Sequence, residues 1–311
     1  MTAGPADGTA GRTAADGPVR VRVPASSANL GPGFDVLAVA VDLTLEVTAV
    51  PFGGRRIVAS GEGADDLEDD DSNLIWRSVV VFCTTHGVDV PDVTLRCDNE
   101  IPLERGLGSS AAAAVAGLAL ARRLTGVRVG NHDLIDHATA LEGHADNAAA
   151  AVLGGLVVAG DGPARRFEPS RSLRPIVCIP DERSSTSAAR GLVPDQVALQ
   201  TMVHAARGTA LVLTGLAGIA AWDPTVMRDT VHEPPRLAAM TGSRRLVHAV
   251  RADGYAACLS GAGPSVLVVV AADDHAAIDR VTALAGADWR VVGAGWDRAG
   301  ARVDHSVSAT S

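Results

Sequence analysis

The stretch IPLERGLGSSAAAAVAGLAL, residues 101–120, constrains the fold of this chain most, because it joins a predicted strand to a long predicted helix through a tight glycine turn. The alternating apolar residues of VTLRCDNEI, residues 93–101, predict the strand. The alanine-rich run after Ser110 predicts a helix that ends near Gly126. The stretch has the glycines and hydroxyls of a phosphate-binding loop but no lysine. It is therefore either an ordinary capped helix or a phosphate site that works without a lysine.

The start of such a helix can bind phosphate by itself. The first turn presents unpaired main-chain N–H groups and about half a positive charge from the helix dipole. Gly106 and Gly108 allow a polyanion to approach the main chain closely. Ser109 and Ser110 could cap the helix, donate to phosphate or offer a hydroxyl to Mg²⁺. The stretch alone does not decide between these roles.

Composition excludes several classes of protein. The chain has 311 residues, of which 47% are hydrophobic and 20% charged, which is typical of one large or two ordinary packed domains. A net charge of -9 argues against a nucleic-acid partner. All 27 basic residues are arginine, so the missing lysine in the loop is not informative by itself. Four widely spaced cysteines, no long apolar run and no secretory signal predict a cytoplasmic protein with no membrane partner.

Predicted strands and helices mix without strict alternation, which favours an α+β fold in two domains over a doubly wound sheet. We expect a disordered tail over 1–18, domains over 19–165 and 166–303, and a frayed end over 304–311. The predicted strands cover 19–23, 36–50, 55–63, 93–101, 155–160, 175–180, 255–260 and 265–271. The predicted helices cover 74–87 (capped by Ser72 or Asn73), 111–126, 132–144 (capped by Asn131), 145–155, about 195–219, about 235–252 and 273–286, with a loop over 181–194.

Two further clusters of glycine and serine change the interpretation of the loop. They are PASSANLGPGFD, residues 24–35, and CLSGAGPSVLVVV, residues 258–270, and each alone could be turn chemistry. In this order, the three clusters resemble the three motifs of the GHMP kinase superfamily, from about Val21 to Val303. PASSANLGPGFDVLAVAVDL, LEGHADNAAAAVLGG and the late WDRAGARV are most similar to its homoserine kinase family. Leu103 and Ala150 depart from that family's pattern, which often has proline there.

The resemblance implies a two-domain GHMP kinase fold, with a ribosomal protein S5 domain 2-like N-terminal domain and a ferredoxin-like C-terminal domain. It implies ATP as phosphoryl donor and Mg²⁺ held by Ser110 and Glu142, a hydroxyl and a carboxylate that suit this ion. It also suggests a homodimer. The ATP-binding residues that it implies are Pro102, Leu103, Glu104, Arg105, Gly106, Leu107, Gly108, Ser109, Ser110, Ala111 and Ala112.

The resemblance further implies L-homoserine as phosphoryl acceptor, with O-phospho-L-homoserine as product on the path to threonine. Arginine suits the carboxylate of such a zwitterion, and an acid suits its ammonium. The implied acceptor-binding residues are Arg190 and Arg236 for the carboxylate, Asp35 with Asn29 for the ammonium, Thr186 and Asn147 near the hydroxyl, and Gly261 of the third cluster.

For the mechanism we expect direct in-line transfer without a phosphoenzyme. Asn147, Asp146 and His144 are the candidate catalytic residues. Asp146 or His144 could act as a base, or the transfer could proceed without one. Three alternatives remain: a GHMP kinase for another small alcohol, a silent nucleotide-binding member, and an unrelated α+β protein. The silent member would require a lost Ser110 or Glu142, and both are present.

Overall fold

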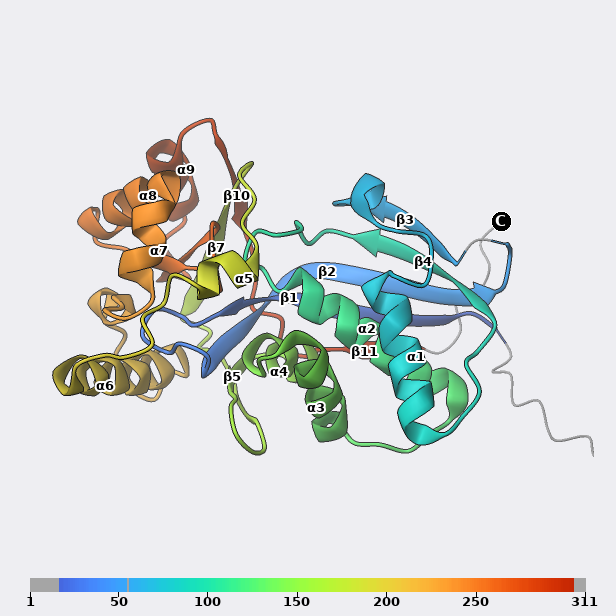
Figure 1. Cartoon of the computed structure of the whole chain (residues 1–311). Helices are drawn as coiled ribbons and strands as arrows, with labels where there is room; N and C mark the ends of the chain where they lie inside the picture. The colour runs from blue at the N-terminus through green and yellow to red at the C-terminus, as the bar shows by residue number, and fades with distance from the viewer. Residues whose placement is uncertain (1–16, 55, 305–311) are drawn as a thin grey trace, which may run out of the picture.

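The structure, a computed structural model, describes residues 17–54 and 56–304. Within them two β-sheets are each covered by helices (Figure 1), which confirms the predicted α+β class. Most of the predicted tail over 1–18 and the residues after Asp304 lie outside the described residues. No helix in the described ranges combines the length and the apolar character that a membrane span needs.

The first sheet is built around a long strand, β2 (Leu37–Pro51). One edge of β2 pairs with β1 (Val19–Ala28), which also pairs with β11 (Arg302–Asp304). The other edge pairs with β4 (Val93–Asn99) and with the short β5 (Leu156–Val158). The strands β3 (Ile57–Gly61) and β6 (Arg165–Phe167) extend the sheet beyond β4 and β5.

Four helices cover one face of this sheet (Figure 1): α1 (Leu74–His86), α2 (Ser109–Thr125), α3 (Asn131–Glu142) and α4 (Asp146–Leu153). The small side chains of α2 permit very close packing, because a Cβ at Gly117 would overlap the carbonyl oxygen of Ile75 in α1. The N-terminal end of α2 is thereby fixed against the sheet, where the glycine loop ends.

The second sheet has the strand order β10 (Trp289–Gly293), β7 (Leu173–Pro180), β9 (Val266–Ala271) and β8 (Ala256–Leu259). All of its neighbouring strands are antiparallel. The helices α8 (Thr241–Ala252) and α9 (Ala277–Ala285) provide the two connections of a βαββαβ unit. This is the predicted ferredoxin-like arrangement.

The remaining elements lie between and beside the two sheets. The short helix α5 (Thr186–Arg190) lies between them, and α6 (Leu199–Leu216) lies at one end of the molecule (Figure 1). The others are η1 (Ala64–Asp66), η2 (Pro224–Met227) and α7 (Glu233–Ala239). β11 pairs with the first sheet, although Arg302 and Val303 fall within the predicted second domain, residues 166–303. The division of the chain at residue 165 stays a prediction.

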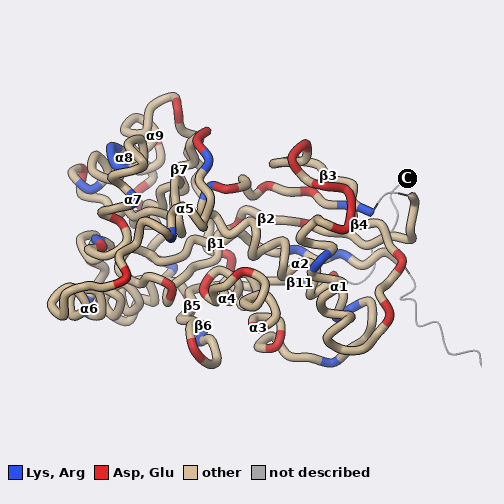
Figure 2. The backbone as a smooth tube through the Cα atoms, in the orientation of Figure 1, with Lys and Arg blue, Asp and Glu red and all other residues tan. Residues whose placement is uncertain are grey.

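Charge is distributed unevenly along the chain. Figure 2 shows acidic residues, in red, gathered along the segment that carries η1 and leads into α1. That segment contains Glu62, Asp65, Asp66, Glu68, Asp69, Asp70 and Asp71.

The four cysteines are all buried and free, in agreement with the predicted reduced thiols.

Three local predictions were wrong. Asn131 is the first residue of α3 and not its cap, because the Asp133 carboxylate accepts from the Gly130 N–H and satisfies the helix start instead. The single helix predicted over 235–252 is two helices, broken where Met240 leaves the helical conformation with φ -104° and ψ 80°. The loop predicted over 181–194 contains α5, whose start is capped by the Ser185 hydroxyl.

Candidate active site

The glycine loop approaches α2 in an unusual main-chain conformation. Gly106 and Gly108 have φ of 73° and 68°, and Glu104 has φ of 55°. Gly108 is the N-cap of α2 and no side chain caps it, which excludes capping from the three roles left open for Ser109 and Ser110. The first N–H groups of α2 are therefore not satisfied by a capping side chain, as an anion site at a helix start requires.

The glycines of the loop are needed for packing against the rest of the protein. A Cβ at Gly106 would overlap the Ser260 carbonyl oxygen, and one at Gly108 would overlap the Ser26 hydroxyl. The sequence predicts that these glycines let a polyanion approach the main chain. In the structure, both positions must be glycine because Ser260 of the third cluster and Ser26 of the first leave no room for a Cβ.

Hydrogen bonds join the three clusters into one unit. The Ser26 N–H donates to the Leu107 carbonyl over 3.0 Å. The Ser260 hydroxyl lies 2.7 Å from the Gly106 carbonyl and 2.9 Å from the Ser27 hydroxyl. The Asn29 side-chain amide donates to the Gly261 carbonyl over 2.7 Å. Segments more than 200 residues apart in the chain thus form a single site.

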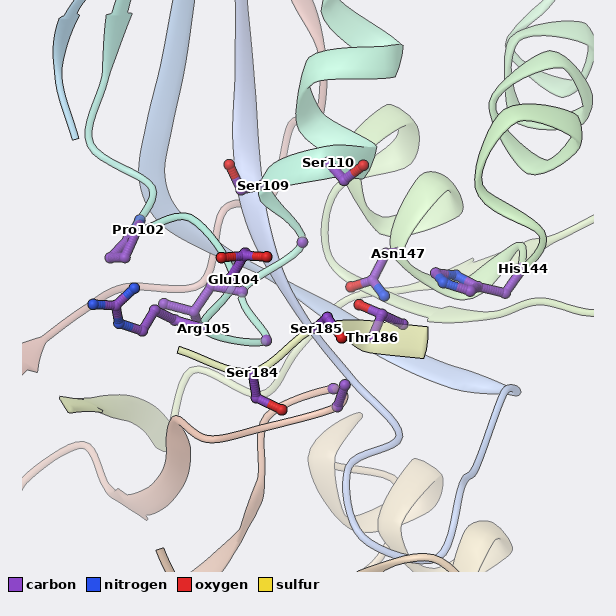
Figure 3. A pocket seen from close by; sticks show the side chains of 15 residues that line it. Pro102, Glu104, Arg105, Ser109, Ser110, His144, Asn147, Ser184, Ser185 and Thr186 are labelled. Atoms are coloured by element: carbon purple, nitrogen blue, oxygen red, sulfur yellow. The ribbon is translucent and has the colours of Figure 1, made fainter. Parts of the chain in front are cut away.

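This unit lines two adjoining cavities. The first, of about 200 Å³, is lined by the glycine loop, by the start of α2, and by the segment before α5 (Figure 3). Of the predicted ATP-binding residues, it contains Pro102, Glu104, Arg105, Gly106, Leu107, Gly108, Ser109 and Ser110. Ser184 and Ser185, which fall within the loop predicted over 181–194, also line it.

Three predicted ATP-binding residues do not line this cavity. Leu103 packs its side chain against Gly63. Ala111 and Ala112 are buried inside α2 at 1% and 0% exposure. The side chains of Ala111 and Ala112 are therefore not available to a nucleotide, and the main-chain N–H of Ala112 already donates to the Gly108 carbonyl.

The second cavity, of about 20 Å³, contains every predicted acceptor-binding residue: Asn29, Asp35, Thr186, Arg190, Arg236 and Gly261. Asp146, His144 and Asn147 line it as well. His144, Asn147, Thr186, Gly261 and Ala262 line both cavities, so the two spaces meet at these residues. The structure therefore brings together residues that the sequence places in five separate segments.

Asp35 and Arg190 form an ion pair in this second cavity, with two hydrogen bonds of 2.9 Å each. Asp35 itself has φ of 56°, and its N–H donates to the Asn29 side-chain oxygen over 3.0 Å. The Asp35 carboxylate accepts from the Arg190 guanidinium, and this hydrogen bond raises the pKa of Arg190 above its ordinary value. The acid and one of the arginines predicted to receive a zwitterion are thus paired with each other.

Arg236 is the buried cation of the cavity, with 2% exposure. Its Nε donates to the Ala189 carbonyl over 3.2 Å, and its Nη1 donates to the Gly261 carbonyl over 3.2 Å. Desolvation lowers its pKa. Among the described residues, no hydrogen-bond partner is found for its Nη2, so that donor is free for a ligand.

The start of α4 supplies the polar groups at the junction of the cavities. The Asn147 side-chain oxygen accepts from the Ser26 hydroxyl over 2.7 Å, which turns the amide nitrogen away from Ser26. Asp146 is 2% exposed, and its Oδ1 accepts from the Asn147 N–H over 2.7 Å. His144 Nδ1 lies 3.3 Å from the same Oδ1, and this carboxylate raises the His144 pKa against the effect of burial.

Ser110 and Glu142 lie together at the edge of the first cavity. The Ser110 hydroxyl donates to Glu142 Oε1 over 2.6 Å. Two adjacent ligands of an octahedral Mg²⁺ ion are separated by about 3.0 Å, given metal–oxygen distances of about 2.1 Å. The two oxygens are close enough to bind one ion if the hydroxyl proton turns away and they move apart by about 0.4 Å. The described residues contain no group of three or more His, Cys, Asp or Glu that could cage a metal.

Comparisons with known proteins agree with this site. Residues 73–155 match the GHMP kinases N terminal domain. The homoserine kinases of Streptomyces coelicolor and Streptomyces avermitilis are each 40% identical over 92% of this chain, and the matches cover 94% and 95% of those proteins. The crystal structure of homoserine kinase from Cytophaga hutchinsonii superposes with a TM-score of 0.80 at 26% identity, covering 92% of this chain and 97% of that one.

The two-sheet fold and the glycine loop beside an acceptor cavity define an ATP-dependent small-molecule kinase of the GHMP type. The similarity extends over nearly the whole length of the relatives. The chain belongs to the homoserine kinase family. The family resemblance expected from the three clusters is thus confirmed.

Proposed function

We propose that this protein transfers the γ-phosphoryl group of ATP to the hydroxyl of L-homoserine, giving O-phospho-L-homoserine for threonine biosynthesis. The observation that carries the proposal is the pair of adjoining cavities, one beside the glycine loop and one holding two arginines and an aspartate. A donor phosphate and an acceptor hydroxyl can meet at Asn147 and Thr186, which line both cavities.

The phosphates of ATP would lie against the main chain from Gly106 to Ser110. Support comes from the free first turn of α2, whose N–H groups and dipole attract anions. Ser184 and Ser185 on the opposite side of the cavity add hydroxyl groups. Main-chain donors and hydroxyls together would replace the lysine that other phosphate loops use.

Ser110 and Glu142 would hold the Mg²⁺ ion, because their oxygens lie 2.6 Å apart where α2 begins beside the first cavity. A bound Mg²⁺ would neutralise charge on the phosphates of ATP. One carboxylate and one hydroxyl are the small number of protein ligands that this ion usually takes beside phosphates.

The acceptor would bind by its two charged groups. The free Nη2 of Arg236 and the guanidinium of Arg190 suit a carboxylate, and Asp35 with Asn29 suits an ammonium. Recognition of both groups favours an amino acid over a simple alcohol or a sugar. This is why homoserine is preferred over the other acceptors of the superfamily.

Most of the rate acceleration in phosphoryl transfer comes from positioning of the reactants and from stabilisation of charge in the transition state. The Asn147 amide, oriented by Ser26, would hold the acceptor hydroxyl in line with the γ-phosphate. Asp146 is placed to receive the hydroxyl proton, with His144 beside it. Turnover of Asp146→Asn decides this point, because near-normal kcat would exclude Asp146 as the base.

The proposed function is tested by ADP release with Mg·ATP and homoserine, mevalonate, galactose or no acceptor. We expect turnover with homoserine far above that with mevalonate, galactose or no acceptor. Turnover with mevalonate and none with homoserine would overturn the acceptor while leaving the GHMP kinase class intact. Homoserine-dependent release should also yield one phosphohomoserine per ADP, which distinguishes transfer from ATP hydrolysis. A homodimer stays a prediction from the family resemblance, and a cytoplasmic location stays a prediction from the sequence.

A further inference from the structure

His232 lies beneath the acceptor cavity and has not entered the site so far. It immediately precedes α7 and is 0% exposed. Its Nδ1 lies 3.1 Å from Arg236 Nη1, and its Nε2 lies 2.8 Å from the Gly31 carbonyl oxygen. The imidazole thus connects the buried arginine of the cavity to the loop of the first glycine-serine cluster, 201 residues away.

These two contacts fix the tautomer of the ring. A guanidinium has only donors, so His232 Nδ1 must accept the hydrogen bond from Arg236 with its lone pair. The ring proton is then on Nε2, where it donates to the Gly31 carbonyl. A proton on Nδ1 would point at a cation and leave the arginine without this acceptor. Burial also lowers the pKa of His232, in agreement with a neutral ring.

The surroundings hold the ring in this orientation. Phe34 stacks on it, with ring centroids 5.1 Å apart and an interplanar angle of 27°. Asp229 accepts from the His232 main-chain N–H over 2.6 Å, and its Oδ2 lies 3.7 Å from Nε2. The Arg236 guanidinium lies over the face of Phe34, 5.3 Å from its centroid. The imidazole, the phenyl ring and the guanidinium therefore pack as one group.

We propose that His232 is a positioning residue for acceptor binding. By accepting from Arg236 Nη1 and donating to Gly31, it aims the free Nη2 of Arg236 into the cavity. The other two anchors of the guanidinium are the carbonyl groups of Ala189 and Gly261. Gly261 also accepts from Asn29 of the first cluster, whereas His232 is the side chain that joins the guanidinium to the loop at Gly31. This inference rests on the proposed function, because it concerns the arginine that would read the homoserine carboxylate.

Two substitutions separate the two hydrogen bonds. Asparagine places its amide near the position of Nδ1, so His232→Asn can keep an acceptor for Arg236 and lose the donor to Gly31. Glutamine places its amide near Nε2, so His232→Gln can keep the Gly31 contact and lose the acceptor for Arg236. We expect His232→Gln to raise the homoserine KM about 10- to 100-fold, since a hydrogen bond to a charged group is lost. His232→Asn should raise it less than about threefold.

Three readouts keep the test specific. The ATP KM should change less than about twofold in both variants, because Arg236 lines the second cavity and not the one beside the glycine loop. The matched control His248→Asn, at an exposed histidine of α8, should leave both KM values unchanged. Equal homoserine KM values in the two variants, or parallel increases in both KM values, would overturn the proposal.

The unmodified protein provides a test that does not depend on the folding of a variant. Nitrogen-15 NMR of histidine-labelled protein should show His232 with an unprotonated Nδ1 and a protonated Nε2. The opposite tautomer, or an imidazolium at neutral pH, would contradict the positioning role. This measurement remains decisive even if homoserine is not a substrate, so a failure of the proposed function can be distinguished from a failure of this inference.

Discussion

Arg190 and Asp35 face each other across the acceptor cavity and share two hydrogen bonds of 2.9 Å, from Nη1 to Oδ2 and from Nη2 to Oδ1. The remaining space, about 20 Å³, is enough for about one water molecule. Homoserine therefore cannot bind unless this pair opens. In the proposed complex, the acceptor carboxylate would pair with Arg190 and the acceptor ammonium with Asp35. Each residue would then exchange its present partner for a group of the acceptor.

Asp35→Asn should test that exchange. The substitution removes the charge that would pair with the acceptor ammonium, so we expect the homoserine KM to rise about 10- to 100-fold while the ATP KM stays within about twofold. Steady-state kinetics with each substrate varied provides the measurement. Asp253→Asn, which disrupts a surface pair with Arg280, is the matched control and should change neither KM. An unchanged homoserine KM in Asp35→Asn would remove Asp35 from the acceptor site.

Glu142→Gln should weaken metal binding at the glycine loop. The variant keeps a side chain that can accept from Ser110 but loses the negative charge, so we expect kcat to fall at least about tenfold at low Mg²⁺. Raising the Mg²⁺ concentration should restore part of the loss. Glu168→Gln, at an exposed pair with Arg166, is the control for a changed surface charge. A Mg²⁺ dependence identical to that of the unmodified protein would count against Glu142 as a ligand.

Ser26→Ala should release the Asn147 amide from its fixed orientation. We expect kcat to fall about 5- to 30-fold, the effect of about 1–2 kcal/mol of lost orientation. In a double-mutant cycle, Ser26→Ala should have little further effect in the Asn147→Ala background. Additive effects of the two substitutions would show that Ser26 does not act through Asn147. The control is Ser78→Ala, because the buried Ser78 hydroxyl donates only within α1, to the Leu74 carbonyl.

Gly106→Ala and Gly126→Ala form a matched pair. Both glycines have left-handed φ, 73° and 72°, but a Cβ at Gly126 meets no atom within 4 Å, whereas one at Gly106 overlaps Ser260. We expect Gly126→Ala to lower the free energy of unfolding by about 1 kcal/mol from backbone strain alone. Gly106→Ala should lower it by about 1–3 kcal/mol more and raise the ATP KM. Equal losses in urea denaturation would show that the loop can move away from the third cluster.

His144 should make stability depend on pH. The Asp146 carboxylate raises the pKa of His144 in the folded protein above the ordinary histidine value of 6.5. The folded state therefore binds the proton more tightly, and the resulting stabilisation is present below 6.5 and disappears as pH rises through the raised pKa. The melting temperature of the unmodified protein, relative to His144→Gln, should thus be higher at about pH 5.5 than at about pH 8.5. A difference that is constant over this range, or that grows with pH, would contradict the assignment.

Features with local causes could be predicted from the sequence. Asn73 caps α1 and Gly87 ends it, because a side-chain acceptor and a left-handed glycine act within one turn. Asn131 is not the cap because the helix starts one residue earlier than predicted, at a Gly130 cap whose N–H donates to the Asp133 carboxylate. The three clusters indicated the site because their residue types are needed wherever main chain binds phosphate.

Side-chain pairings across the fold could not be predicted. Ser26 and Asn147 are 121 residues apart, and Asp35 and Arg190 are 155 apart, so no local pattern joins them. The family resemblance implied that Arg190 binds the acceptor carboxylate and Asp35 the acceptor ammonium, and it did not imply that they pair with each other. Ser26 and His232 had no predicted role. Burial and orientation decide these roles, and both depend on how the two sheets pack.

The pairing of β11 with β1 has a consequence for the order in which the enzyme matures. β1 is the first described strand to leave the ribosome and β11 is the last, so the outer edge of β1 stays open until β11 has been synthesised. β1 also carries Ser26 and Ser27, which hold the glycine loop and the turn at Ser260. The nucleotide site is therefore finished late, and a nascent chain that lacks its final strand should not yet bind ATP tightly.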